Sequence, residues 1–175
     1  DILDFSKMEA GKQEIVRHVY DSSSLLNNVL SVSSTKMVGK NLELIVDVDP
    51  TLPTQFIGDE IRLRQIITNL LNNAIKYTEK GSVLFCVECG EVINGKTMLK
   101  VSVKDTGIGI PEEHCNRIFE RFYRVDKSRS KQTGGTGLGL AIVKHIVEQI
   151  GATISIQSEV GVGTEIKVEF PAVKE

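Results

Sequence analysis

Two asparagines and a lysine recur at helical spacing in the stretch from Asp59 to Thr78. At about 100° per residue in an α-helix, Asn73 lies about 40° from Asn69, and Lys76 lies about 20° from Asn69 on the other side. The three side chains therefore share one strip. Asparagine is a mediocre helix former, so its use here costs helix stability unless the side chains have a function. The strip is either a solvated helix face with chance asparagines or a binding surface, with Asn73 a candidate oxygen ligand for magnesium and Lys76 a partner for phosphate.

A carboxylate followed by two glycines stands at the end of an expected strand, residues 97–105. Strand alternation turns one set of side chains to the buried side, namely Leu99, Val101, Val103 and Asp105. Gly107 and Gly109 would let the backbone approach a flat ligand closely. A carboxylate at the end of a buried row is either a satisfied structural acceptor or a ligand contact. Because two glycines follow the carboxylate, we interpret Asp105 as a ligand contact.

A basic segment precedes a second glycine cluster. Residues 117–131 contain six basic and two acidic side chains, interleaved with aromatic residues, and the sequence Gly-Gly-Thr-Gly-Leu-Gly-Leu follows at residues 134–140. A charge run is usually a solvated face. Glycines that open a helix, however, present free backbone N–H groups to an anion, and the helix N-terminus adds partial positive charge. We therefore predict a lid over phosphates at about residues 111–136.

The expected elements position these groups around one core. An apolar stripe marks the helix behind the asparagine strip, capped by Asp59 and formed by Leu63, Ile66, Ile67, Leu70, Leu71 and Ala74. Further helices are predicted from Asp21 to about Gly39 and from Leu140 to Ile150. In the last helix, Leu140, Val143, Val147 and Ile150 are expected to be buried and His145 to be solvated.

Strands are predicted at residues 14–19, 42–48, 82–89, 97–105, 152–157 and 164–170, and Pro50 and Pro53 predict an extended loop ahead of Gly58. Asn94-Gly95 is a hairpin turn signal between the middle two. Ile166, Val168 and Phe170 should point inward. Thr164 shares their parity, so its hydroxyl could reach a ligand over the sheet or cap the hairpin.

Composition limits the class of protein. The chain has 175 residues, 41% of them hydrophobic and 25% charged, with a net charge of −2, which fits one globular domain and excludes collagen and disorder. We expect no transmembrane helix and no nucleic-acid partner, since no apolar run reaches about 20 residues and no overall positive charge is present. Cys86 and Cys89 fall on opposite sides of a strand and Cys115 stands alone, so a reducing, cytoplasmic setting is expected, with zinc as the alternative.

The ordered set favours phosphoryl transfer, which needs positioning, a divalent metal and positive charge on the phosphate oxygens. No GxxxxGK[ST] loop and no HRD or DFG motif is present, so P-loop and protein-kinase architectures are excluded.

Four motifs in this order resemble a known family. The sequences NLLNNAIKYT (69–78), DTGIGI (105–110), FERFYR (119–124) and GGTGLGLAI (134–142) are similar to the N, first glycine, F and second glycine boxes of sensor histidine kinases. The similarity covers roughly residues 16–171. It implies an α/β fold of the Bergerat type, a two-layer sandwich in which three helices cover one face of a mixed, mostly antiparallel sheet.

The resemblance also implies ATP and magnesium as cofactors. Asn73, Lys76 and Arg124 would be catalytic, with Asn73 as the metal ligand and Arg124 at the γ-phosphate. Asp105 would take the adenine amino group. The full set of implied nucleotide contacts is Asn69, Asn73, Lys76, Tyr77, Asp105, Gly107, Gly109, Ile110, Gly135, Thr136, Gly137, Leu138, Gly139 and Thr164.

One departure from the family's pattern concerns the acceptor. The family's phosphate-accepting histidine lies in a motif resembling SHELRTP, which nothing here matches, and none of His18, His114 and His145 suits that role. Residues 1–13 resemble the end of the second dimerisation helix, and residues 14–175 the catalytic ATP-binding domain. The resemblance implies partners absent from this chain, namely its own dimerisation helices and a receiver domain, and leaves a membrane anchor in the full-length protein open.

Two other functions stay open at this point. The first is a nucleotide-sensing module without transfer activity. The second is an ATPase of the chaperone or topoisomerase branch, which would need an acidic general base, for which Glu60 is the nearby candidate.

Overall fold

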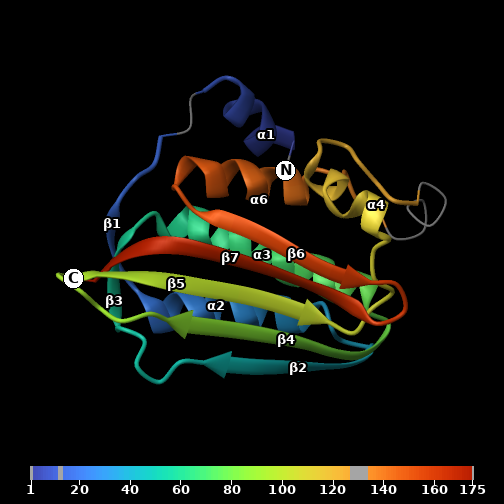
Figure 1. The fold of residues 1–175 in the computed structure, drawn as a ribbon, viewed down its shortest axis with the longest axis horizontal. Helices are drawn as coiled ribbons and strands as arrows, with labels where there is room; N and C mark the ends of the chain where they lie inside the picture. Colours follow the sequence, from blue (N-terminus) through green and yellow to red (C-terminus); the bar gives the residue numbers. More distant parts are fainter. Residues whose placement is uncertain (1, 12–13, 127–133, 175) are drawn as a thin grey trace.

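The computed structural model describes residues 2–11, 14–126 and 134–174. It has two layers, an open mixed sheet and a layer of helices packed on one of its faces, as Figure 1 shows. The predicted α/β sandwich is confirmed.

The sheet has seven strands, in the order β1-β3-β7-β5-β4-β2, with β6 paired to β7. Their bounds are His18–Asp21 for β1, Asn41–Val48 for β2, Gln55–Gly58 for β3, Lys80–Cys89 for β4, Lys96–Asp105 for β5, Thr153–Glu159 for β6 and Gly163–Lys174 for β7. Only the β2–β4 pair among these is parallel. The sheet is thus mixed and mostly antiparallel, as expected.

Three helices cover the inner face of the sheet: α2 (Ser22–Thr35), α3 (Glu60–Tyr77) and α6 (Gly139–Gln149). Their apolar side chains and those of β4, β5 and β7 form one core cluster. The shorter elements are α1 (Ile2–Glu9), α4 (Glu112–Cys115) and the 3-10 helix η1 (Arg117–Phe119). Met8 joins α1 to the core, while Ile2 and Leu3 are exposed.

The helix that carries the asparagine strip is fixed at its start as predicted. The Asp59 carboxylate accepts the N–H of Arg62 at 3.0 Å and the N–H of Val16 at 3.0 Å. Asp21 caps α2 in the same way, by accepting the N–H of Ser24 at 2.7 Å. The whole predicted apolar stripe of α3 is buried, so the orientation of the strip follows from the core.

Several boundaries differ from the prediction. The loop expected after Pro50–Pro53 contains a short strand, β3, because Phe56 is buried and its neighbours pair with β1 and β7. The first strand begins at His18 rather than at residue 14, and α2 ends at Thr35 instead of near Gly39. Strand β7 runs on to Lys174, where it meets β3. Long-range pairing, which local patterns do not contain, sets these limits.

The last helix is buried over a wider arc than predicted. Val143 and Val147 are buried as expected, but Ala141, Ile142 and Ile146 are buried too, whereas Leu140 and Ile150 are only partly buried. His145 is half-buried, and its Nε2 atom is buried without a hydrogen-bond partner. The prediction of a solvated His145 is therefore wrong. Viewed down the helix axis, its side chain projects between those of the buried residues Ala141 and Ile142.

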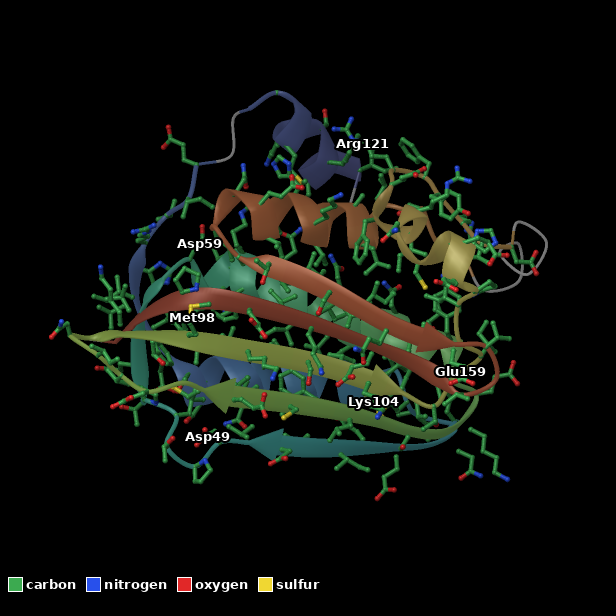
Figure 2. The ribbon with its side chains drawn as sticks, in the orientation of Figure 1. Asp49, Asp59, Met98, Lys104, Arg121 and Glu159 are labelled. Atoms are coloured by element: carbon green, nitrogen blue, oxygen red, sulfur yellow. The ribbon has the colours of Figure 1, made fainter. Side chains whose placement is uncertain are left out.

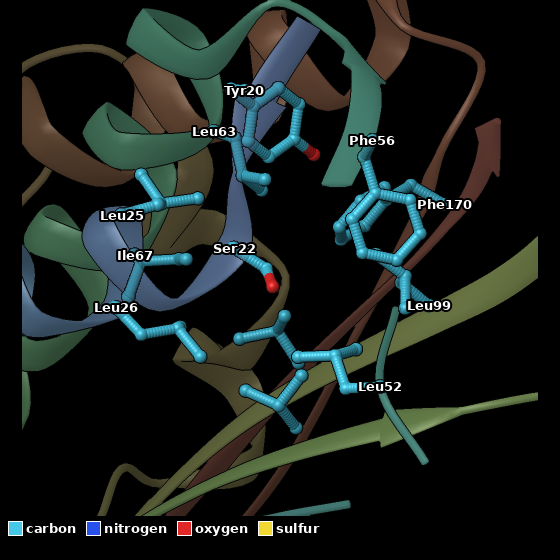
Figure 3. Close-up of a pocket in the computed structure, with 12 residues that line it drawn as sticks. Tyr20, Ser22, Leu25, Leu26, Leu52, Phe56, Leu63, Ile67, Leu99 and Phe170 are labelled. Carbon is cyan, nitrogen blue, oxygen red and sulfur yellow. The ribbon is translucent and has the colours of Figure 1, made fainter. Parts of the chain in front are cut away.

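A small cavity of about 20 Å³ lies in the core between β3, α2 and α3, as Figure 3 shows. The Ser22 hydroxyl in its wall donates to the carbonyl of Pro53 at 2.8 Å, and the other lining residues are mostly apolar. The cavity is far too small for a nucleotide.

Three general expectations can be compared with the described residues. Cys86, Cys89 and Cys115 are free thiols. No described helix is long and apolar enough to cross a membrane. Within the described ranges, no three His, Cys, Asp or Glu side chains gather into a group that could hold a metal ion.

Candidate functional site

A cleft of about 590 Å³ opens between α3, the ends of β5 and β7, the α4–η1 segment and the start of α6. This volume falls in the usual range for small-molecule sites, about 300–1,000 Å³. The structure brings together, in its walls, most of the residues proposed from sequence: Asn69, Asn73, Lys76, Tyr77, Asp105, Gly109, Ile110, Arg124, Gly135, Thr136, Gly137, Gly139 and Thr164. Their individual contacts with a nucleotide stay predictions.

The asparagine strip faces the second glycine cluster. The Asn69 amide donates to the carbonyl of Gly139 at 3.3 Å, and the Lys76 ammonium donates to the carbonyl of Gly134. Lys76 also lies over the Tyr77 ring, 5.2 Å from its centroid. The strip therefore forms one wall of the cleft, and the glycine cluster forms the wall beside it.

Two cations meet at Gly135. Its φ is +147°, and a Cβ there would lie 2.5 Å from Lys76 Nζ and 3.6 Å from Arg124 Nη2. Glycine thus allows the Lys76 ammonium to approach the backbone at this point, while Arg124 lies beside it at ordinary van der Waals distance. The convergence of Lys76, from a helix, and Arg124, from the predicted lid, makes a positively charged end of the cleft suited to phosphate.

Asp105, unlike these two cations, is a buried carboxylate with an exposed fraction of 9%. Its carboxylate accepts the N–H of Gly107 at 2.8 Å and also the backbone N–H of Thr164. Burial raises the pKa of Asp105, and the two N–H groups oppose that rise. The predicted inward orientation of this carboxylate is confirmed.

Thr164 pairs directly with Asp105 across the β5–β7 ladder. Its hydroxyl lies 2.7 Å from that of Ser158, which accepts the N–H of Ile110 at 2.8 Å and donates to the carbonyl of Gly163 at 3.0 Å. Ser158 therefore ties the first glycine segment to the β6–β7 hairpin. Ser158 could not be found from the sequence, because a lone serine on a strand belongs to no pattern.

Two of the proposed residues do not line the cleft. Leu138 is buried at 1% exposure, and its N–H donates to the Thr136 hydroxyl at 3.3 Å. Gly107 packs against the end of α3, where a Cβ would lie 2.5 Å from the carbonyl oxygen of Tyr77 and 2.9 Å from the Thr78 hydroxyl. Both positions support the walls of the cleft from behind.

The cleft also includes residues that the sequence did not single out, among them Asn72, Glu79, Ile108, Tyr123, Asp126 and Val160. Asn72 could have been found by geometry, since it lies about 40° from Lys76 around the helix. Glu79 and Val160 lie in turns, where periodicity gives no direction.

The predicted lid is only partly described. The Tyr123 hydroxyl is hydrogen-bonded to His114 Nδ1, and the Arg117 guanidinium lies 4.4 Å from the centroid of the Tyr123 ring. Phe122 meets Phe5 of α1 edge to face at 5.9 Å. Figure 2 shows Arg121 beside α1, where its guanidinium is 4.8 Å from the Phe5 ring centroid. The remaining basic residues predicted for the lid, Lys127, Arg129 and Lys131, lie outside the described residues.

Glu60, the candidate general base of the ATPase hypothesis, lies at the first turn of α3 outside the cleft. It pairs with Arg64, and its other oxygen lies 3.5 Å from His18 Nε2. Along the helix it stands about 20 Å from Asn73. The structure therefore does not support Glu60 as a base acting on a ligand in the cleft.

The fold and the cleft define a two-layer α/β sandwich with a cleft of small-molecule size, and comparison with known proteins gives its family. Residues 58–174 match the family model described as histidine kinase-, DNA gyrase B- and HSP90-like ATPase. The chain belongs to this family, and similar proteins place it among the catalytic ATP-binding domains of histidine kinases.

Three relatives illustrate the similarity in sequence. The signal transduction histidine-protein kinase BarA of Escherichia coli (strain K12) is 43% identical over 91% of this chain and 17% of its own length. The sensor protein GacS of Pseudomonas syringae pv. syringae is 39% identical over 100% of this chain and 20% of its own. Hybrid signal transduction histidine kinase B of Dictyostelium discoideum is 37% identical over 98% of this chain and 9% of its own length. The chain thus spans a minor part of each relative.

Solved structures agree with this placement. Full-length ShkA in complex with AMPPNP superposes with a TM-score of 0.83 at 34% identity, over 99% of this chain and 35% of that one. The catalytic domain of the histidine kinase ThkA, in a nucleotide-free form, superposes with a TM-score of 0.72 at 27% identity, over 91% of this chain and 96% of that one.

Proposed function

We propose that this domain binds ATP with magnesium in the cleft and transfers the γ-phosphate to a histidine on another protein segment. The observation that carries the proposal is the convergence of an asparagine strip, two cations and a buried carboxylate on one cleft, in a domain of the histidine kinase type. The cations and the amides suit the phosphates of a nucleotide, and the carboxylate suits its base.

The nucleotide would lie with its base toward Asp105 and its phosphates toward Lys76 and Arg124. The buried Asp105 carboxylate can accept from the exocyclic amino group of adenine, which guanine does not offer in that place. Support for the phosphate end comes from the two side chains beside Gly135. In this arrangement the γ-phosphate lies nearest the predicted lid.

Magnesium would be held by Asn73 and by phosphate oxygens. Magnesium prefers oxygen ligands, keeps several waters and is bound at many phosphate sites by one or two protein groups. When bound, it would neutralise charge on the phosphates during transfer. The amide of Asn73 fits such a site because it lines the cleft on the strip that also carries Lys76.

Partners follow from the proposed reaction. The acceptor histidine would be presented by dimerisation helices of the full-length protein, and the phosphoryl group would then pass to a response-regulator receiver domain. None of the chain's own histidines suits the role: His18 lies in β1, His114 is bonded to Tyr123, and His145 is half-buried in α6. The cytoplasmic location of the domain, and any membrane anchor of the full-length protein, remain part of this proposal.

A direct test combines the chain with ATP radiolabelled on its γ-phosphate, magnesium, and the histidine-bearing dimerisation helices of a related kinase. We expect acid-labile, base-stable label on the acceptor. The label should be lost when the acceptor histidine is replaced, and also when the Asn73→Ala variant is used in place of the unchanged domain. Absence of label despite measured ATP binding would contradict transfer and support a nucleotide-sensing module.

A further inference from the structure

Helix α3 ends without a left-handed residue. Its last turn carries Lys76 and Tyr77, both of which line the cleft. The residue that follows, Thr78, is extended, with φ −114° and ψ 112°. Helices that end with a left-handed glycine satisfy their last carbonyl groups through the backbone turn that follows. Here other donors must reach these carbonyls.

Three donors do so, from three parts of the chain. The buried Thr78 hydroxyl donates to the carbonyl of Ala74 at 2.7 Å. The N–H of Ile108, in the first glycine segment, donates to the carbonyl of Tyr77 at 3.4 Å. The ammonium of Lys40 donates to the carbonyl of Ile75 at 2.5 Å and lies 3.5 Å from that of Thr78.

Lys40 reaches this place from the connection between α2 and β2, and its side chain does not line the cleft. A cation at a helix C-terminus interacts favourably with the partial negative charge of the terminal carbonyls. Hydrogen bonds from charged donors are also the stronger ones. Lys40 therefore fixes the last turn of α3 through two carbonyls without touching the cleft.

The same helix end sets the position of the first glycine segment. A Cβ on Gly107 would lie 2.5 Å from the carbonyl oxygen of Tyr77 and 2.8 Å from the Asp105 carboxylate. The last turn of α3 and the Asp105 turn are thus packed without space between them. A shift of the helix end would displace Lys76 and Tyr77 on one side and the backbone of Gly107 and Ile108 on the other.

We infer that Lys40 is a positioning residue for the nucleotide site, which acts by fixing the end of α3 against the first glycine segment. The inference rests on the proposed nucleotide binding. It assigns to a residue outside the cleft an effect on both ends of the ligand, the phosphates through Lys76 and the base through the Asp105 turn.

The experiment compares Lys40→Met and Lys40→Arg with the unchanged chain, and uses Lys36→Met as a matched control, since Lys36 is exposed on the preceding turn. Amide hydrogen exchange at Ile108 is measured without nucleotide, and affinities for ATP and ADP are measured by calorimetry. For Lys40→Met we expect faster exchange at Ile108 and affinities for ATP and ADP that fall by a similar factor, about tenfold. Lys40→Arg should restore both, and Lys36→Met should change neither.

Unchanged exchange at Ile108 in Lys40→Met would overturn the inference, as would affinities within twofold of those of the unchanged chain. Equal losses in the Met and Arg variants would also overturn it, since the charge would then be irrelevant. Failure of the unchanged chain to bind ATP would instead overturn the proposed function, and the exchange measurement would still report separately on the contact made by Lys40.

Discussion

The carboxyl group of Asp105 is buried at the end of β5, and burial raises its pKa above the ordinary value. In its ionised form, such a group makes the fold less stable than a neutral group of the same shape would. Its two backbone donors, Gly107 and Thr164, offset part of that cost. We therefore expect Asp105 to lower the stability of the fold while serving binding, a combination that is common at functional sites.

Replacing Asp105 with Asn tests this at the level of binding. The variant keeps the shape but loses the charged acceptor proposed for the adenine amino group. We expect the affinity for ATP to fall about tenfold or more, as for the loss of one hydrogen bond to a charged group. Calorimetric titration with ATP and GTP measures this, and unchanged affinity with unchanged preference for ATP would contradict the assigned role.

The same variant gives a prediction for stability against pH. Because the folded chain holds the Asp105 proton more tightly than the unfolded chain, this group contributes stability that is fully present below the ordinary pKa of 3.8 and is lost as the pH rises through the raised folded pKa. Relative to Asp105→Asn, the unchanged chain should thus lose unfolding free energy over that window. Urea unfolding of both proteins at several pH values measures the difference. A difference that stays constant, or that grows in favour of Asp105, would be inconsistent with the burial argument.

Arg124→Ala should separate ATP from ADP. Arg124 approaches Gly135 beside Lys76 at the proposed phosphate end. If it contacts the γ-phosphate, the affinity for ATP should fall about tenfold to a hundredfold, and that for ADP should change little. Titration with the two nucleotides checks the prediction, and equal losses for both would place Arg124 elsewhere.

At this scale the sequence predicted residues with a strong pattern and missed those without one. Asp105 and the asparagine strip follow from strand parity and helical spacing, which local geometry determines. Ser158 and Glu79 gave no signal, because their positions depend on a hairpin and a turn. The buried Nε2 of His145 was missed since the width of a buried arc depends on neighbouring elements.

At the scale of elements, the second glycine cluster can be tested with a matched pair. Gly134 and Gly135 both have positive φ, +59° and +147°, but a Cβ on Gly134 would meet open space, whereas one on Gly135 would displace Lys76. Gly135→Ala should therefore lower the affinity for ATP severalfold beyond Gly134→Ala, and it should also strain the backbone more, since φ +147° lies in a region that is essentially restricted to glycine, whereas φ +59° does not. Melting temperatures control for that strain. Equal affinities in the two variants would show that Lys76 is not constrained by the cluster.

Elements with a complete local signal were predicted best. The apolar stripe and the Asp59 cap of α3 set its face and its start, and Asn94-Gly95 set the β4–β5 turn, where both residues have positive φ. Strand β3 was missed because four residues after a proline-rich loop show no alternation. Its strand character comes from pairing with β1 and β7, which lie far away in sequence.

For the whole molecule, the effect of a substitution in α3 on the unfolding free energy should depend on whether the side chain faces the core. Leu71 has 0% exposure and lies outside the cleft, while Ile61 on the same helix is 63% exposed. Leu71→Ala should lower the unfolding free energy by about 2–5 kcal/mol, and Ile61→Ala should change it by less than about 0.5 kcal/mol. Urea unfolding measures both. Similar losses in the two variants would argue against the core as described.

The overall architecture could be predicted because the four motifs occur in a fixed order that resembles one family. The parallel β2–β4 pair and the placement of β7 between β5 and β6 could not be, since strand order depends on contacts between distant segments. The relation between α1 and the lid, seen in the Phe5–Phe122 contact, is likewise a property of the folded chain.

Binding of magnesium–ATP in the cleft can be tested by calorimetric titration with ATP, with and without magnesium, of the purified chain and of its Asn73→Ala variant. We predict saturable one-to-one binding that magnesium strengthens, and a variant that keeps its fold but loses the magnesium dependence, because Asn73 lies on the cleft side of α3 and off its buried stripe. Absence of binding at millimolar ATP, or the same magnesium dependence in Asn73→Ala, would contradict the assignment of this cleft as a magnesium–ATP site.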